Sequence, residues 1–230
     1  MIATKCSTQN PEGGLDLFVD KNSSNRKTIS HALGHTDDIG FYPIVLKCKE
    51  PATASKTRLH LVCYQDYPQS TGVHISVDCF NRLVDDFAQL VMFKHEDCPG
   101  LAKLSALRAS EAGRRRVSVL VGNGGLYLPQ ELARGADGAM TGFAYPEMLV
   151  QVVALYKAGE VDRAEDLFDA YLPMVRYEQQ PGFGLAVRKE TLYRRGAIAC
   201  PATRAPGPSL SPTDLNELDR LMTRLETRLG

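Results

Sequence analysis

The segment Leu90-Val91-Met92-Phe93-Lys94-His95-Glu96-Asp97-Cys98-Pro99-Gly100 decides the predicted fold. Its first five residues form an apolar run that closes on a lysine, and an abrupt polar break follows. A run of this length predicts a buried β-strand, and the break predicts a loop between that strand and a helix. Lys94 therefore stands at the end of a buried strand, which is where α/β folds place their chemistry.

The lysine at this position has two interpretations. An amine held among apolar groups loses the hydration of its charged form, which lowers the pKa of the lysine. Such an amine can attack a carbonyl carbon at neutral pH and form a Schiff base. The alternative is a solvated lysine at a strand end, and this segment taken alone favours that alternative.

The composition is that of an ordinary globular protein. The chain has 230 residues, of which 43% are apolar, and its 27 lysines and arginines balance 27 aspartates and glutamates. This balance gives no indication of nucleic acid or an anionic membrane as a partner. The basic run at residues 114–116 lies between a helix-like and a strand-like segment, which favours a solvated turn.

The sequence also indicates a compartment. It holds no apolar stretch of the roughly 20 residues that span a bilayer, and its first residues do not resemble a signal peptide. The six cysteines are scattered and form no Cys-x-x-Cys pair. Scattered thiols favour the reduced state and a cytoplasmic location over a disulfide framework or a zinc site.

From residue 58 onward, strand patterns alternate with helix patterns. Such alternation predicts an α/β protein with a parallel sheet and crossover helices, either a barrel or a doubly wound sheet. Residues 1–57 are rich in Gly, Asn and Ser, and apart from one strand candidate at 41–48 they predict an irregular segment. We expect an irregular segment at 1–57, a sheet domain at 58–160 and a helical region at 161–230. Strands are predicted at 59–64, 90–94, 117–121 and 137–141, and helices at 76–88, 99–112, 128–134, 146–158, 161–175, 185–195 and 213–229.

Three further motifs have competing interpretations. The turn Gly122-Asn123-Gly124-Gly125 could cradle an anion, but it fits neither Gly-x-Gly-x-x-Gly nor a P-loop, so a tight turn is the stronger interpretation. The residues 95–98 are all metal-ligand types, yet four consecutive residues rarely converge on one ion, so no metal is predicted. Tyr64, at the end of the strand at 59–64, could relay protons over a pocket, or it could belong to a capped turn.

Taken in order, these segments resemble the C-terminal half of the dihydrodipicolinate synthase / N-acetylneuraminate lyase family. The resemblance covers about residues 59–229. It rests on four pieces: Tyr64-Gln-Asp-Tyr-Pro-Gln-Ser-Thr-Gly72, Phe93-Lys94-His95-Glu96, Val121-Gly122-Asn123, and Gly135-Ala-Asp-Gly-Ala-Met-Thr141. They are similar to the family's tyrosine loop, its Schiff-base strand, the turn after the next strand, and its last barrel strand.

The resemblance implies a (β/α)8 TIM barrel with C-terminal helices and a class I aldolase or lyase that acts on pyruvate or a related 2-oxo acid. It assigns Lys94 as the Schiff-base nucleophile and Tyr64 as a catalytic proton relay. It places Gly122 and Met140 in the substrate pocket. No metal or other cofactor is implied, and a homo-oligomer is compatible with the family.

The sequence departs from the family pattern in two regions, the tyrosine loop and residues 1–57. The family's tyrosine lies three residues before the proline, and counting back from Pro68 gives Gln65, so a one-residue bulge is needed to bring Tyr64 to that place. Gln69-Ser70 also stands where some members carry an arginine for the substrate's distal carboxylate. The family's Gly-Thr/Ser-x-Gly-Glu loop, which binds the substrate's carboxylate, is not found in residues 1–57.

These departures bear on the whole protein. Residues 59–145 supply only about four of the eight βα units of a barrel. The expected fold is therefore a partial barrel whose N-terminal strands are missing. Two alternatives to an active lyase stay open: a catalytically impaired remnant with a structural or interaction role, and a different fold with a nucleotide site at Gly122.

Overall fold

The computed structural model describes residues 15–18, 44–48 and 61–230. The chain divides into two compact units, Met1–Leu120 and Val121–Gly230, which are described separately here. These bounds differ from those of the expected domains 58–160 and 161–230. The expectation for residues 1–57 falls mostly on residues outside the described ones.

The described part of the first unit contains a mixed sheet in the order β1-β2-β3-β4-β5. β1 pairs with β2, and β2 with β3, in antiparallel fashion, whereas β3 and β4 are parallel. A parallel pair needs a crossover, and α3 supplies it. The strands are β1 (Leu15–Phe18), β2 (Ile44–Cys48), β3 (Leu61–Asp66), β4 (Leu90–His95) and β5 (Ser118–Val121), the last of which reaches the boundary between the units.

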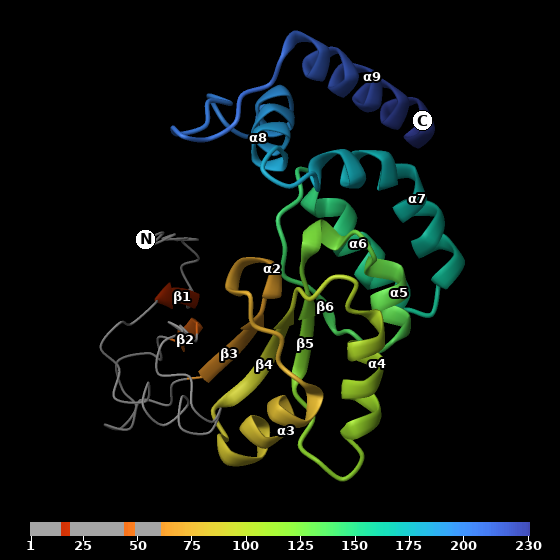
Figure 1. The fold of residues 1–230 in the computed structure, drawn as a ribbon. Coiled ribbons are helices and arrows are strands. Elements are labelled where there is room, and N and C mark those ends of the chain that lie inside the picture. The colour runs from red at the N-terminus through yellow and green to blue at the C-terminus, as the bar shows by residue number, and fades with distance from the viewer. Residues whose placement is uncertain (1–14, 19–43, 49–60) are drawn as a thin grey trace, which may run out of the picture. The chain divides into compact units, whose positions relative to one another are not determined.

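The described part of this unit also contains helices α2 (Pro68–Thr71), α3 (Val77–Asp86) and α4 (Leu101–Ser110). Ser76 is the N-cap of α3, because its hydroxyl accepts a hydrogen bond from the Cys79 amide. Figure 1 shows α3 beside β4 and α4 beside β5, and α3 packs against α4. The apolar core of the unit comes from α3, α4 and the strands and includes Tyr64, Phe80, Leu83, Phe93, Leu104, Leu107 and Val119.

The second unit is mostly helical. Helix α7 contacts α6, α8 and α9, as can be followed in Figure 1. One continuous core joins these helices, and it includes Met148, Val152, Phe168, Met174 and Leu218. The elements are a 3-10 turn at Asn123–Gly125, α5 (Leu128–Ala133), β6 (Gly138–Ala139), α6 (Pro146–Lys157), α7 (Val161–Glu178), α8 (Gly184–Arg194) and α9 (Pro212–Leu229).

The α/β class predicted from the sequence is confirmed, and so is the parallel pairing of the strands that carry Tyr64 and Lys94. Predicted and observed elements agree to within about three residues at most ends. Within the second unit, α6 packs against α7. Within the described residues, none of the helices has the length and apolarity that a membrane crossing requires.

Candidate active site

The candidate site begins with the register between β3 and β4. Gln65 pairs with Lys94, and Tyr64 pairs with Phe93. Paired residues of a parallel sheet point to the same face, and successive residues along a strand alternate between faces. Lys94 therefore shares one face, called here the lysine face, with Gln65 and with Cys63 two residues earlier. The neighbouring residues of each strand point to the opposite face, which packs against α3.

Lys94 is largely covered and has a charged partner. Its side chain is 18% exposed, and its Nζ lies 3.0 Å from Oε2 of Glu96, whose side chain is 11% exposed. Gln65 donates a hydrogen bond from Nε2 to the same glutamate oxygen. The lysine amine thus stands in a small polar group at the carboxyl end of two parallel strands, and is not a freely solvated side chain.

Cys63 adds a thiol to the lysine face. Its side chain is buried, and burial raises the pKa of the thiol to about 11, against the smaller lowering effect of Lys94. A thiol with a pKa this high stays protonated at neutral pH and is a poor nucleophile. Lys94 is therefore the stronger nucleophile candidate on this face.

Tyr64 does not reach this face. Its ring stacks on Phe93 with centroids 6.0 Å apart and meets the edge of Phe80 from α3 at the same distance. Burial raises the pKa of the Tyr64 phenol, which opposes an acid–base role near neutral pH. A register irregularity does occur, but it lies between Val62 and Cys63 and leaves Tyr64 opposite Phe93. The structure therefore does not bring Tyr64 and Lys94 together.

Tyr64→Phe tests this placement. The phenylalanine keeps the ring contacts and removes the hydroxyl, so we expect the rate at which Lys94 forms an imine with pyruvate to change by less than about threefold. A proton relay would contribute about 10²-fold or more. The measurement is the rate of adduct formation under borohydride. A hundredfold loss in a folded Tyr64→Phe chain would place the phenol at the reacting atoms after all.

The remaining residues of the polar break form a separate group. Lys103 of α4 lies 2.6 Å from Asp66 and 3.2 Å from Asp97, and His95 Nε2 lies 3.0 Å from the Gly100 carbonyl. A Cβ at Gly100 would come within 2.2 Å of His95 Nε2, so the close approach requires glycine. Within the run 95–98, Glu96 thus contacts Lys94, whereas Asp97 contacts Lys103. Across the described residues, no three His, Cys, Asp or Glu side chains gather as a metal site.

Gly122 and Met140 lie in the second unit, whereas Lys94 and Tyr64 lie in the first. Gly122 is buried and begins the glycine turn, in which the φ angles of Asn123 and Gly124 are 52° and 65°. A Cβ at Gly124 would lie 1.9 Å from the Gln179 side chain, so the turn requires glycine there. The tight-turn interpretation fits this geometry.

Hydrogen bonds to backbone groups fix the segment that follows β6. The Met140 amide donates to the Val121 carbonyl at 2.8 Å, and the Gly124 amide donates to the Thr141 hydroxyl at 2.7 Å. Two side chains from the helices hold the residues that follow. Arg188 of α8 donates to the Gly142 carbonyl at 2.8 Å, and Glu178 of α7 accepts from the Ala144 amide at 3.0 Å.

Glu178 and Arg188 also pair with each other, with 2.5 Å between Oε1 and Nε. The glutamate side chain is completely buried, and burial raises its pKa while Arg188 opposes the rise. Neither residue is predicted from the sequence. They lie on different helices, and neither belongs to a local motif that could have identified them.

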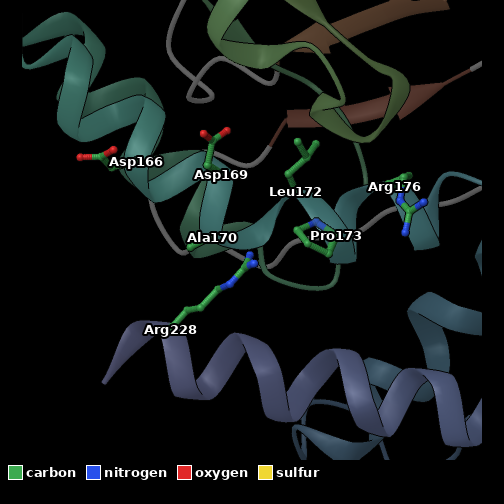
Figure 2. Close-up of a pocket in the computed structure, with 7 residues that line it drawn as sticks. All are labelled: Asp166, Asp169, Ala170, Leu172, Pro173, Arg176 and Arg228. Atoms are coloured by element: carbon green, nitrogen blue, oxygen red, sulfur yellow. The ribbon is translucent and has the colours of Figure 1, made fainter.

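The second unit also carries an open groove of about 690 Å³ between α7 and α9. Figure 2 shows Arg228 reaching from α9 toward α7. The groove contains none of the predicted site residues. It is lined by Asp166, Asp169, Ala170, Leu172, Pro173, Arg176 and Arg228.

Comparison with known proteins identifies relatives. The profile of the dihydrodipicolinate synthetase family matches residues 51–225. L-2-keto-3-deoxyarabonate dehydratase from Azospirillum brasilense is 28% identical over 165 residues, which are 72% of this chain and 52% of that protein. 4-Hydroxy-tetrahydrodipicolinate synthase from Methanothrix thermoacetophila is 28% identical over 182 residues, which are 77% and 58% of the two chains.

A solved structure shows the same likeness. The crystal structure of dihydrodipicolinate synthase from Rhodopseudomonas palustris superposes with a TM-score of 0.67 and 49% identity, covering 70% of this chain and 55% of that one. The chain thus spans about half the length of these relatives. The likeness in sequence and the likeness in fold both fall on the part of the chain that contains Lys94.

Proposed function

The chain belongs to the dihydrodipicolinate synthetase family, and we propose that it is a lyase of the Schiff-base aldolase type that acts on pyruvate or a related 2-oxo acid. Lys94 is the nucleophile in this proposal. One observation carries it: the lysine that the family resemblance selects lies at the carboxyl end of β4, with its side chain only 18% exposed. In parallel α/β sheets this end of the strands is where ligands bind.

The proposed chemistry follows from the amine. The Lys94 nitrogen adds to the keto carbon of the 2-oxo acid, and water leaves to give an imine. The protonated imine withdraws electrons from the neighbouring carbon, so it stabilises the carbanion that forms when a bond to that carbon breaks or is made. The proposal includes the finer fold expectation, a partial TIM barrel, with Gly122 and Met140 in the substrate pocket.

A second function has its own support. Residues 1–57 contain no Gly-Thr/Ser-x-Gly-Glu segment of the kind that binds the carboxylate of the 2-oxo acid in the family. A chain without that loop could keep the family's fold and lose its activity. The rival proposal is therefore an impaired family member with a structural or interaction role.

Borohydride trapping distinguishes the two functions. The wild-type protein is incubated with pyruvate and sodium borohydride, digested, and weighed by mass spectrometry. The lyase proposal expects a gain of one reduced pyruvate on the peptide that contains Lys94, and no gain with lactate, which lacks the keto group. An unmodified chain, or a gain spread over exposed lysines, would support the impaired family member.

A further inference from the structure

A carboxylate shares the lysine face with the proposed nucleophile. Glu96 follows Lys94 by two residues, and residues two apart in an extended segment point the same way. The distance between its Oε2 and the Lys94 Nζ is 3.0 Å, which is within hydrogen-bond reach. Both side chains are mostly covered, at 11% and 18% exposed. Glu96 thus contacts the atom that would react.

Gln65 fixes the position of that carboxylate. Its Nε2 donates to Oε2 of Glu96, the same oxygen that faces the lysine. Gln65 stands directly across from Lys94 in the parallel register, and it occupies the place, three residues before Pro68, where the family resemblance expects a tyrosine. An amide cannot exchange a proton near neutral pH. The phenol of Tyr64 points to the other face, whereas the carboxylate of Glu96 lies within hydrogen-bond reach of the amine.

The neighbouring acidic residues have other partners. Asp66 and Asp97 both pair with Lys103 of α4. Asp66 is also 3.5 Å from His95. The contacts of Asp66 and Asp97 are with Lys103 of α4, whereas Glu96 extends to the lysine face. The adjacent carboxylates of Glu96 and Asp97 therefore contact two different lysines, Lys94 and Lys103 respectively.

We propose that Glu96 is the general acid–base of imine formation in this protein, an inference that rests on the proposed Schiff-base function. Glu96 accepts a proton from the Lys94 ammonium, which frees the nitrogen lone pair to form the bond to the keto carbon. One of the two protons that remain on the nitrogen moves to the keto oxygen, which becomes the hydroxyl of the resulting carbinolamine. Glu96 returns its proton to that hydroxyl, the C–O bond breaks, and water leaves as the imine forms. Protons and electrons balance without an oxidant or a metal.

The test compares variants of two adjacent residues. The rate of the pyruvate adduct at Lys94 is measured by borohydride trapping in the wild type, Glu96→Gln, Glu96→Ala and the control Asp97→Asn. A positioned acid–base group contributes about 10²- to 10⁴-fold. We expect both Glu96 variants to slow the adduct by about 10²-fold or more, and Asp97→Asn to stay within about threefold of the wild type.

Chemical rescue separates an acid–base role from a structural one. Glu96→Ala leaves space beside the amine, so added formate should restore the rate in proportion to its concentration, and formate should not accelerate the wild type. A Glu96→Gln or Glu96→Ala chain that reacts at the wild-type rate overturns the inference. So does a slow Glu96→Ala chain that formate does not rescue, or a wild type that formate accelerates equally.

The same data keep this inference separate from the proposed function. If the wild type forms no adduct at Lys94, the Schiff-base function fails, and the inference fails with it. If the wild type forms the adduct and the Glu96 variants form it equally fast, only the role of Glu96 fails. Far-ultraviolet circular dichroism of each variant confirms that the chains compared are folded.

Discussion

Lys94→Arg is expected to reduce the pyruvate adduct to background. Arginine keeps a positive charge beside Glu96, but its guanidinium does not lose its proton in proteins and so supplies no nucleophile. The structure around the site should change little, because the ion pair at 3.0 Å can be kept in part. The measurement is the mass of the intact chain after pyruvate and borohydride. Of the changes considered, this one has the largest effect on the proposed chemistry.

Lys103→Arg is the matched control. Its side chain is 14% exposed against 18% for Lys94, and it too is held by carboxylates, those of Asp66 and Asp97. The difference is position, because Lys103 lies on α4 and Lys94 ends a strand. We expect Lys103→Arg to keep the adduct. An adduct that survives Lys94→Arg and disappears in Lys103→Arg would show that Lys103, and not Lys94, is the nucleophile.

Much of the fold could be predicted because local signals agree with the tertiary structure. The apolar run at 90–94 becomes β4. The apolar residues Phe80, Leu83 and Val84 of α3, which begins after the N-cap Ser76, are buried. Short-range periodicity fixes such elements. It does not fix which elements pack together, and the packing of α6 against α7 has no local signature in the sequence.

The site shows the same limit. Lys94 could be found because it combines a strand end with a family motif. Glu96 was considered only as a metal ligand, together with His95 and Asp97, although the alternation of a strand already places it on the side of Lys94. For Tyr64 the opposite holds, because the family motif favours the tyrosine, whereas the register of β3 against β4 turns its ring toward Phe80. Alternation along the strand was the better guide at both positions.

Arg188→Met is expected to lower the free energy of unfolding by about 3–5 kcal/mol at neutral pH, the usual cost of leaving a buried charge without its partner. The Glu178 side chain is fully buried, and Arg188 is 30% exposed. Methionine keeps most of the packing of the arginine stem but neither its charge nor its donor to Gly142. The measurement is urea unfolding followed by circular dichroism.

Arg194→Met provides the matched comparison on the same helix. Arg194 is 21% exposed and pairs with Glu190 and Asp219, whose side chains are 16% and 66% exposed. Water can solvate these carboxylates more readily than Glu178, so this change should cost no more than about 1 kcal/mol. Equal losses in the two variants would show that the burial of Glu178 does not determine the cost.

The pH dependence of the Arg188→Met loss should identify Glu178 as its cause. Burial raises the pKa of Glu178 in the folded state above its ordinary value of 4.5, and Arg188 opposes that rise, so removing Arg188 raises it further. A group with a raised folded pKa contributes stability that is fully present below its unfolded pKa and is lost as the pH rises through the folded value. The stability loss caused by Arg188→Met should therefore shrink toward pH 4.5 and grow above it.

Adding Glu178→Gln to Arg188→Met should remove this pH dependence, because the amide carries no charge and can still accept the hydrogen bond from Ala144. A loss that stays constant with pH would trace the cost to the missing arginine donor and not to an unpaired carboxylate.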